Sequence, residues 1–348
     1  MKAMVLNGLG QPLRLENVPE PKVGPNDAKI RVRAVGVGLT VVHMIQQPGL
    51  VTAYPRIPGH EVAGEVVEVG SAVTSLKPGQ RVTNHFYLTC GQCRYCRAGR
   101  ESLCTAFGGY VGMACNGGYA EYMVLPARNF VPVPDGVSDV DAAVAADAIA
   151  TPYHACTKEA AIAPGDNVLV FGAGGGVGIH VVQVAKACGA RVIAVDLGEK
   201  KLEGARAAGA DELVDGARGE LVKQVTALTG GRGVDSVIDV VAAKETLEAS
   251  LAALAPGGRL VVVGVRPPAV FGDQSKFTVD ATQVVRKGIE IHGSRYVTAA
   301  EIGQTLELLR QKRVRAIVDS TFPLEEAEHV HQLIRDNALV GRVALVIP

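Results

Sequence analysis

The sequence predicts an α/β protein made of a β-rich N-terminal domain and a doubly wound parallel domain. The chain has 348 residues, which at about 150 residues per domain indicates two domains. Up to residue 150, short apolar segments are separated by turns that contain proline or glycine, as is typical of strands. Beyond residue 150, apolar strands alternate with segments of helical periodicity, which indicates βαβ units and a parallel sheet.

The composition excludes several classes of partner. Lysine plus arginine and aspartate plus glutamate both number 35, so the formal charge is zero, and the pI is about 7.1. Such a chain has no electrostatic attraction for nucleic acid or for an acidic membrane surface. The hydrophobic fraction of 48% excludes disorder. Because neither a secretory signal nor a run of about 18 apolar residues is present, we expect a soluble, cytoplasmic protein.

The first domain is predicted to contain strands at 28–35, 61–69 and 119–125, with turns such as Lys77-Pro-Gly79 between them. A helical pattern first occurs at Asp139 to Ala150, which is rich in alanine. We therefore expect an irregular all-β arrangement before this helix.

The second domain begins after the turn Pro164-Gly165-Asp166 with an apolar strand at 167–171. A helix follows whose apolar face includes Val181, Val184, Ala185 and Cys188, and Gly189 is placed to end it. The alternation continues with strands at 191–196, 211–214, 234–240 and 259–264, and with helices at 199–208, 220–228 and 243–254. This order predicts a doubly wound sheet.

A glycine-rich loop separates the first strand and helix of that domain. Backbone N–H groups and the positive end of the helix would face a pyrophosphate there. The G-x-x-G-x-x-G spacing differs from the strict G-x-G-x-x-G pattern, and such glycines can also serve packing alone. The predicted coenzyme residues in the loop are Gly172, Gly174, Gly175, Gly176, Val177 and Gly178.

Asp196, at the end of the next strand, favours dinucleotide binding over packing. A carboxylate at this position can accept hydrogen bonds from both adenosine ribose hydroxyls and would repel a 2′-phosphate. We therefore predict NAD(H) rather than NADP(H) as the coenzyme. The alternative is NADP(H), because the positive charges of Lys200 and Lys201 could still accommodate its 2′-phosphate.

Four cysteines form a metal-ligand pattern, Cys90-x2-Cys93-x2-Cys96-x7-Cys104. Four thiolates match a closed tetrahedral zinc site. An iron–sulfur cluster is the alternative, but the last spacing and the missing Cys-Pro ending disfavour it. Because four protein ligands leave no open position, we predict one structural zinc per chain that takes no part in chemistry.

The motifs together resemble the zinc-type medium-chain alcohol dehydrogenases over essentially the whole chain. They are Gly59-His-Glu61 with the strand after it, the four-cysteine lobe and the glycine loop. The resemblance implies a GroES-like catalytic domain over 1–150 and 293–348, and a Rossmann dinucleotide-binding domain over 151–292. It also implies a homodimer or homotetramer. By the same resemblance Lys201 contacts the adenosine ribose, Arg342 reaches the coenzyme pyrophosphate, and Val263 and Val265 line the nicotinamide.

The catalytic-zinc ligands depart from this family. Gly38, which has no side chain, stands where the family has a zinc-binding cysteine. His60 and Asp147 match the other ligand positions, and Glu61 is able to approach as a third ligand. Cys115, Cys156 and Cys188 offer no clear substitute for the thiolate. Since such a set binds zinc poorly, we expect no tightly bound catalytic zinc, and a vestigial site at His60, Glu61 and Asp147.

The rest of the catalytic apparatus matches the family. Thr40 and His43 correspond to its proton-relay hydroxyl and histidine, and Phe86 to a wall of its substrate pocket. The alternative is that His43 and His60 are satisfied polar residues in a domain cleft. Their order and spacing favour a catalytic set of Thr40, His43, His60 and Asp147.

The primary hypothesis is an NAD-dependent oxidoreductase that interconverts an alcohol and an aldehyde or ketone of small or medium size. Without the metal, the carbonyl must be polarised by hydrogen-bond donors, which are weaker than a Lewis acid. The first alternative is therefore conjugate reduction of an α,β-unsaturated carbonyl compound, in which the developing charge is an enolate. The second alternative, from another class, is an NAD-binding protein that has lost catalysis.

Overall fold

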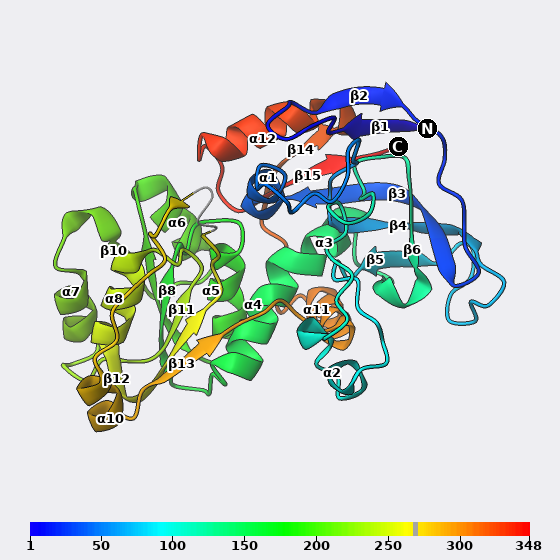
Figure 1. Cartoon of the computed structure of the whole chain (residues 1–348). Helices are drawn as coiled ribbons and strands as arrows, with labels where there is room; N and C mark the ends of the chain where they lie inside the picture. The colour runs from blue at the N-terminus through cyan, green and yellow to red at the C-terminus, as the bar shows by residue number, and fades with distance from the viewer. Residues whose placement is uncertain (267–270) are drawn as a thin grey trace. The chain divides into compact units, whose positions relative to one another are not determined.

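The computed structural model describes residues 1–266 and 271–348, which form two compact units (Figure 1). Unit 1 comprises Met1–Ala150 and Tyr296–Pro348, and unit 2 comprises Thr151–Arg295. The boundaries expected from the sequence were 150 and 292. The C-terminal segment belongs to unit 1 because its last strand pairs with a strand near the N-terminus.

A mixed sheet forms the centre of unit 1, with the strand order β14-β15-β3-β4-β5-β7, and β6 also pairs with β3. A separate ribbon is formed by β1 (Lys2–Val5) and β2 (Arg14–Asn17). The strands of the mixed sheet are β3 (Asp27–Val37), β4 (Glu61–Val69), β5 (Arg81–Asn84), β6 (Tyr122–Pro126), β7 (Phe130–Pro132), β14 (Val318–Pro323) and β15 (Arg342–Val346).

The pairing register brings distant parts of unit 1 together at one end of β3. Strand β15 runs antiparallel to β3 with Val343 opposite Val37, which places Arg342 beside Gly38. Strand β4 runs antiparallel on the other side of β3, with Glu61 opposite Gly36. Because of this register, residues from three separate segments meet at the start of helix α1.

The expectation of an all-β arrangement before Asp139 is wrong, because two short helices lie there. They are α1 (Leu39–Met44) and α2 (Arg94–Arg97). Each is too short to show the periodicity by which a helix is recognised in sequence. The other helices of this unit are α3 (Asp139–Val144), the π-helical η3 (Ala145–Ile149), α11 (Ala299–Arg310), α12 (Ala327–Arg335) and the 3-10 turns η1 (Glu101–Leu103), η2 (Ala127–Asn129) and η6 (Leu324–Glu326).

Unit 2 is a doubly wound α/β unit. Its six strands are parallel in the order β10-β9-β8-β11-β12-β13, so the strand order reverses between β8 and β11. Ligands of such sheets bind at the carboxyl ends of the strands beside this reversal. The strands are β8 (Asn167–Phe171), β9 (Arg191–Asp196), β10 (Glu212–Asp215), β11 (Val234–Asp239), β12 (Leu254–Val262) and β13 (Glu290–Gly293).

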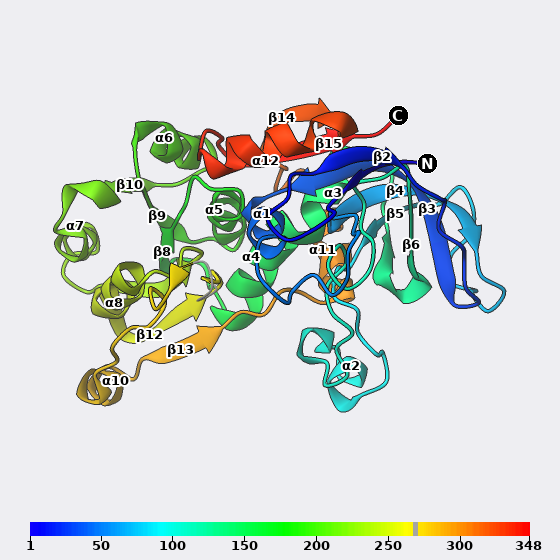
Figure 2. The ribbon, with the colours of Figure 1, turned by 45° about the horizontal axis from the view of Figure 1, so that its top comes forward.

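The helices of unit 2 cover both faces of this sheet (Figure 2). Helices α5 and α6 pack together on one face, and α7 and α8 pack together on the other. The helical elements are α4 (Ala150–His154), η4 (Ala155–Glu159), α5 (Gly178–Ala187), α6 (Glu199–Ala207), η5 (Gly216–Arg218), α7 (Leu221–Leu228), α8 (Lys244–Ala253) and α10 (Ala281–Lys287). None of the helices in the described part of the chain has the length and hydropathy that crossing a bilayer requires.

Strand β12 begins earlier than the sequence suggested. Its first residue is Leu254 and not Arg259, because the strand continues through Pro256, Gly257 and Gly258. A register shift against β11 between Val234 and Ser236 accommodates these residues.

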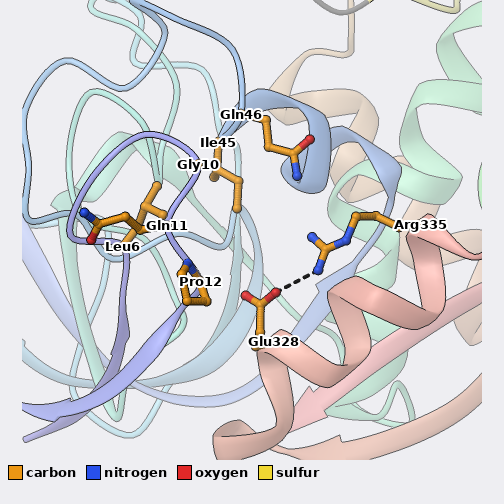
Figure 3. A pocket seen from close by; sticks show the side chains of 8 residues that line it. All are labelled: Leu6, Gly10, Gln11, Pro12, Ile45, Gln46, Glu328 and Arg335. Atoms are coloured by element: carbon orange, nitrogen blue, oxygen red, sulfur yellow. Dashed lines mark hydrogen bonds and ion pairs between the residues drawn. The ribbon is translucent and has the colours of Figure 1, made fainter.

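A small surface cavity of about 200 Å³ lies in unit 1 beside α1 and α12 (Figure 3). The ion pair between Glu328 and Arg335, with a nitrogen–oxygen distance of 2.7 Å, forms part of its wall. The cavity is lined by Leu6, Gly10, Gln11, Pro12, Ile45, Gln46, Glu328 and Arg335, none of which is a predicted site residue.

A buried histidine in α12 makes unit 1 sensitive to acid. His331 is completely buried, and its Nε2 lies 2.9 Å from the Tyr119 hydroxyl. Burial lowers the pKa of His331 from its usual 6.5 to about 4. Between these two values the unfolded chain binds a proton that the folded chain does not, so stability falls as the pH falls.

Because of this histidine, we expect the free energy of unfolding to fall by roughly 2 kcal/mol when the pH is lowered from about 7.5 to about 5. Urea unfolding of the wild type and of His331→Gln at both pH values measures the effect. The substitution should reduce the pH dependence by about that amount. An identical pH dependence in the two proteins would show that His331 does not titrate in this way.

Candidate active site

The four cysteines of the predicted zinc site converge in one lobe. Their Sγ atoms lie within 4.8 Å of one another. Neighbouring sulfur atoms are 3.5 Å apart for Cys93–Cys96 and Cys104–Cys90, and 3.9 Å apart for Cys90–Cys96. Tetrahedral zinc with Zn–S bonds of about 2.3 Å requires sulfur–sulfur separations of about 3.8 Å. The four thiols therefore fit a tetrahedral zinc ion.

Backbone N–H groups stabilise thiolate charge in the same lobe. The Cys93 N–H points at Cys90 Sγ at 3.3 Å, and the Cys90 N–H points at Cys104 Sγ at 3.3 Å. Hydrogen bonds from the backbone of Cys96 and Thr105 lower the pKa of the Cys93 thiol to about 5. Desolvation raises the pKa of Cys96 to about 12. A bound cation is what would hold all four as thiolates.

The glycine loop of unit 2 is shaped by close backbone approach. Gly172 has a φ of +71°, a conformation that favours glycine. A Cβ at Gly174 would overlap the Lys201 carbonyl oxygen, and one at Gly178 would overlap the Gly172 carbonyl oxygen. The loop ends at the start of α5, where the first N–H groups of a helix are suited to a phosphate.

Asp196 lies beside this loop at the end of β9. Its Oδ2 accepts a hydrogen bond of 2.7 Å from the Gly174 N–H, and its Oδ1 accepts one of 2.7 Å from the Leu197 N–H. The carboxylate is therefore held at the mouth of the loop, where an adenosine ribose would lie. The loop and Asp196 fit a nicotinamide dinucleotide.

Sequence reasoning missed one residue that supports the loop. His180 in α5 is completely buried, and its Nδ1 lies 2.8 Å from the Gly176 carbonyl oxygen. It occupies the buried side of the helix, where the sequence showed only a histidine among apolar residues. The other coenzyme residues named from the resemblance, Val263 and Val265, follow β12, and Val265 is 78% exposed.

His60, Glu61 and Asp147 form the second group of possible metal ligands in the described residues, and we call it the acid–histidine cluster. Their ligand atoms lie within 4.8 Å of one another, and all three residues are buried. His60 Nε2 lies 3.3 Å from Asp147 Oδ2 and 3.8 Å from Glu61 Oε1. Asp147 lies in the π-helical η3, a rare form that often occurs at functional sites.

Arg342 lies beside both carboxylates of this cluster. Its Nη2 donates to Glu61 Oε1, its Nε donates to Glu61 Oε2 at 3.3 Å, and Nη2 lies 3.8 Å from Asp147 Oδ2. The resemblance assigned Arg342 to the coenzyme pyrophosphate, whereas the structure places its guanidinium among the residues of the acid–histidine cluster. The pairing of Arg342 with Glu61 had no signal in the sequence, because the two residues lie near opposite ends of the chain.

The acid–histidine cluster as arranged does not fit a catalytic zinc. It offers no thiolate, and the permanent positive charge of Arg342 lies beside both carboxylates and would repel a dication. Burial raises the pKa of Glu61, and Arg342 opposes this effect while Asp147 adds to it. Cys115, Cys156 and Cys188 belong to neither group of possible metal ligands in the described residues.

Aromatic rings cover one side of the acid–histidine cluster. The Phe86 ring lies 4.5 Å from that of His60 and 4.2 Å from that of Tyr296, measured between ring centroids. The Tyr296 hydroxyl donates a hydrogen bond of 2.5 Å to the Ala146 carbonyl, next to Asp147. Tyr296 was not recognised in the sequence, since an isolated tyrosine carries no motif.

The predicted proton-relay residues lie in α1, directly after Gly38. Thr40 and His43 are both half-buried. Gly38 precedes the first residue of this helix and therefore connects the relay residues to the end of β3. The helix brings them to the same end of unit 1 as Arg342.

The sequence matches two family descriptions. Residues 24–135 match "Alcohol dehydrogenase GroES-like domain", and residues 176–311 match "Zinc-binding dehydrogenase". A protein named NAD-dependent alcohol dehydrogenase from Sulfurisphaera tokodaii is 33% identical over 99% of this chain and 100% of its own length. A protein named acryloyl-coenzyme A reductase from Metallosphaera sedula is 33% identical over 99% of both chains.

Among solved structures, too, the chain is similar to alcohol dehydrogenases. The crystal structure of the alcohol dehydrogenase from Aeropyrum pernix superposes with a TM-score of 0.90 at 33% identity, covering 100% of both chains. A GroES-like unit together with a doubly wound dinucleotide-binding unit defines the medium-chain class of dehydrogenases and reductases. This chain belongs to the zinc-type alcohol dehydrogenase family within that class.

Proposed function

We propose that the protein is an NAD(H)-dependent oxidoreductase that interconverts an alcohol and an aldehyde or ketone without a tightly bound catalytic zinc. The observation that carries this proposal is the buried acid–histidine cluster, with Arg342 and no thiolate, in a chain of this family. We also propose that the enzyme is cytoplasmic, and that it forms a homodimer or homotetramer, as the family resemblance implies.

The coenzyme would be held by unit 2. The loop from Gly172 to Gly178 and the start of α5 would hold the pyrophosphate, and Asp196 would hold the adenosine ribose and disfavour a 2′-phosphate. When bound, NAD(H) supplies or accepts the hydride. Lys201 lies against the same loop, because its backbone contacts the position of Gly174.

The protein's own groups would handle the proton. In the direction of reduction, the alkoxide that forms needs a proton, and the Thr40 hydroxyl would deliver it with His43 connecting it to solvent. Phe86 would form an apolar wall beside His60, which favours a largely apolar substrate. The four-cysteine lobe would hold one structural zinc and take no part in this chemistry.

Conjugate reduction of an α,β-unsaturated carbonyl compound is the second candidate. The absence of a thiolate at Gly38 favours it, since an enolate needs less polarisation than an alkoxide. The similarity to the protein named acryloyl-coenzyme A reductase also supports it.

A substrate pair distinguishes the two candidates. NADH oxidation is measured with a saturated ketone and with its α,β-unsaturated analogue, and NAD⁺ reduction is measured with the corresponding saturated alcohol. Turnover of the saturated ketone and of the alcohol is expected. Turnover of the unsaturated compound alone, with a saturated ketone as its product, would contradict the primary proposal and support conjugate reduction.

A further inference from the structure

Gly38 is explained by space and not by backbone conformation. Its φ of −141° and ψ of 176° are extended values that any residue adopts. A Cβ on Gly38 would lie 2.7 Å from Nη2 of Arg342 and still closer to Nη1 and Cζ. A side chain at position 38 and the guanidinium in its present place therefore exclude each other.

The guanidinium brings a permanent positive charge to the acid–histidine cluster. Arg342 is 3% exposed and lies between Glu61 and Asp147. An arginine side chain does not lose its proton in proteins, so this charge is present at any working pH. At the positions that match zinc ligands in the family, the carboxylates of Glu61 and Asp147 therefore face the guanidinium of Arg342.

One nitrogen of the guanidinium, Nη1, is not used in the pairing with Glu61. Nε and Nη2 are directed at Glu61. Within the described residues, Nη1 donates no hydrogen bond. Nη1 is also the atom nearest to the place of the missing side chain at Gly38. Its two N–H groups can therefore serve an oxygen atom that enters the site.

We propose, building on the proposed function, that Arg342 is a catalytic residue that replaces the zinc ion as the electrophile. When the carbonyl carbon accepts the hydride supplied by NADH, the C=O π electrons move to the oxygen. Nη1 donates a hydrogen bond to that oxygen and keeps its proton, and the oxygen takes its proton from the Thr40 hydroxyl. The substrate is reduced, the coenzyme is oxidised, and the protein returns to its initial state after Thr40 is reprotonated from solvent.

The first test removes the guanidinium. For Arg342→Ala we expect kcat for carbonyl reduction to fall by at least about 100-fold, as when one oxyanion donor is removed. Added guanidinium ions should restore part of the rate, whereas the Kd for NADH should change little. The control is Arg335→Ala, which removes an arginine paired with Glu328 at 2.7 Å in the same unit and should leave kcat unchanged.

The second test reports on the place of the guanidinium without using activity. The double variant Gly38→Cys/Arg342→Ala should bind one more Co²⁺ per chain than the wild type, with a thiolate-to-cobalt charge-transfer band. Neither Gly38→Ser/Arg342→Ala, which lacks the thiolate, nor Gly38→Cys, which has the thiolate but retains the guanidinium, should show this band.

Two results would overturn the proposal. One is a folded Arg342→Ala protein that retains kcat but binds NADH far more weakly, because the arginine would then serve the coenzyme. The other is the cobalt band in Gly38→Cys with Arg342 intact, because the guanidinium would then not occupy the site. The cobalt measurement is independent of turnover, so a failure of the proposed function, seen as no turnover of any carbonyl or alcohol, is distinguished from a failure of this proposal.

Discussion

Replacing Cys93 by serine is expected to lower the free energy of unfolding by about 4 kcal/mol or more and the Tm by roughly 10 °C. The thiols of Cys93 and Cys96 lie 3.5 Å apart in a group that fits tetrahedral zinc, and metal binding at such a site contributes directly to folding. Thermal unfolding and elemental analysis of the purified variant measure the two consequences, the lost stability and the lost zinc.

Cys115→Ser provides the matched control for this experiment. Cys115 belongs to neither group of possible metal ligands in the described residues, so the same chemical change there should leave the zinc content unchanged. An unaltered Tm and an unaltered zinc content in Cys93→Ser would contradict the assignment of a structural zinc to this lobe.

Replacing Asp196 by serine is expected to lower the preference for NADH over NADPH by roughly 100-fold, measured as the ratio of the two kcat/KM values. The wild-type carboxylate would face the 2′-phosphate of NADPH, and such a pair of like charges costs several kcal/mol. The steady-state kinetics of both coenzymes with one carbonyl substrate give the ratio.

The variant Asp196→Asn distinguishes the effect of the negative charge from the effect of the hydrogen bond that Asp196 accepts from the glycine loop. Its amide oxygen can still accept the hydrogen bond that Gly174 donates to the wild-type carboxylate at 2.7 Å, whereas the negative charge is lost. The asparagine variant should therefore also lose much of its preference for NADH. A wild-type enzyme that already prefers NADPH would contradict the role given to Asp196.

Features whose residues lie close together in the sequence could be predicted from it. The four cysteines lie in one loop, so their spacing alone indicates a tetrahedral metal site, and the structure brings all four sulfur atoms together. The strands and helices of unit 2 were predicted for a similar reason, since the apolar runs of parallel strands and the glycine loop are local signals.

The arrangement around Gly38 could not be predicted in this way. The sequence showed that the family's cysteine is replaced by glycine, but not what occupies the space. Arg342 reaches it because β15 pairs with β3 in a particular register, and strand register between distant segments has no local signature. Tyr296, whose hydroxyl donates a hydrogen bond to the backbone next to Asp147, was missed because an isolated tyrosine carries no motif.

The most direct test of a catalytic site without zinc is the metal content of the wild-type protein, measured together with its turnover after chelation. We expect about one zinc per chain, held by the four-cysteine lobe, and carbonyl reduction that survives a chelator able to remove loosely held zinc. Two tightly bound zinc ions per chain, with turnover lost when one of them is removed, would contradict this expectation.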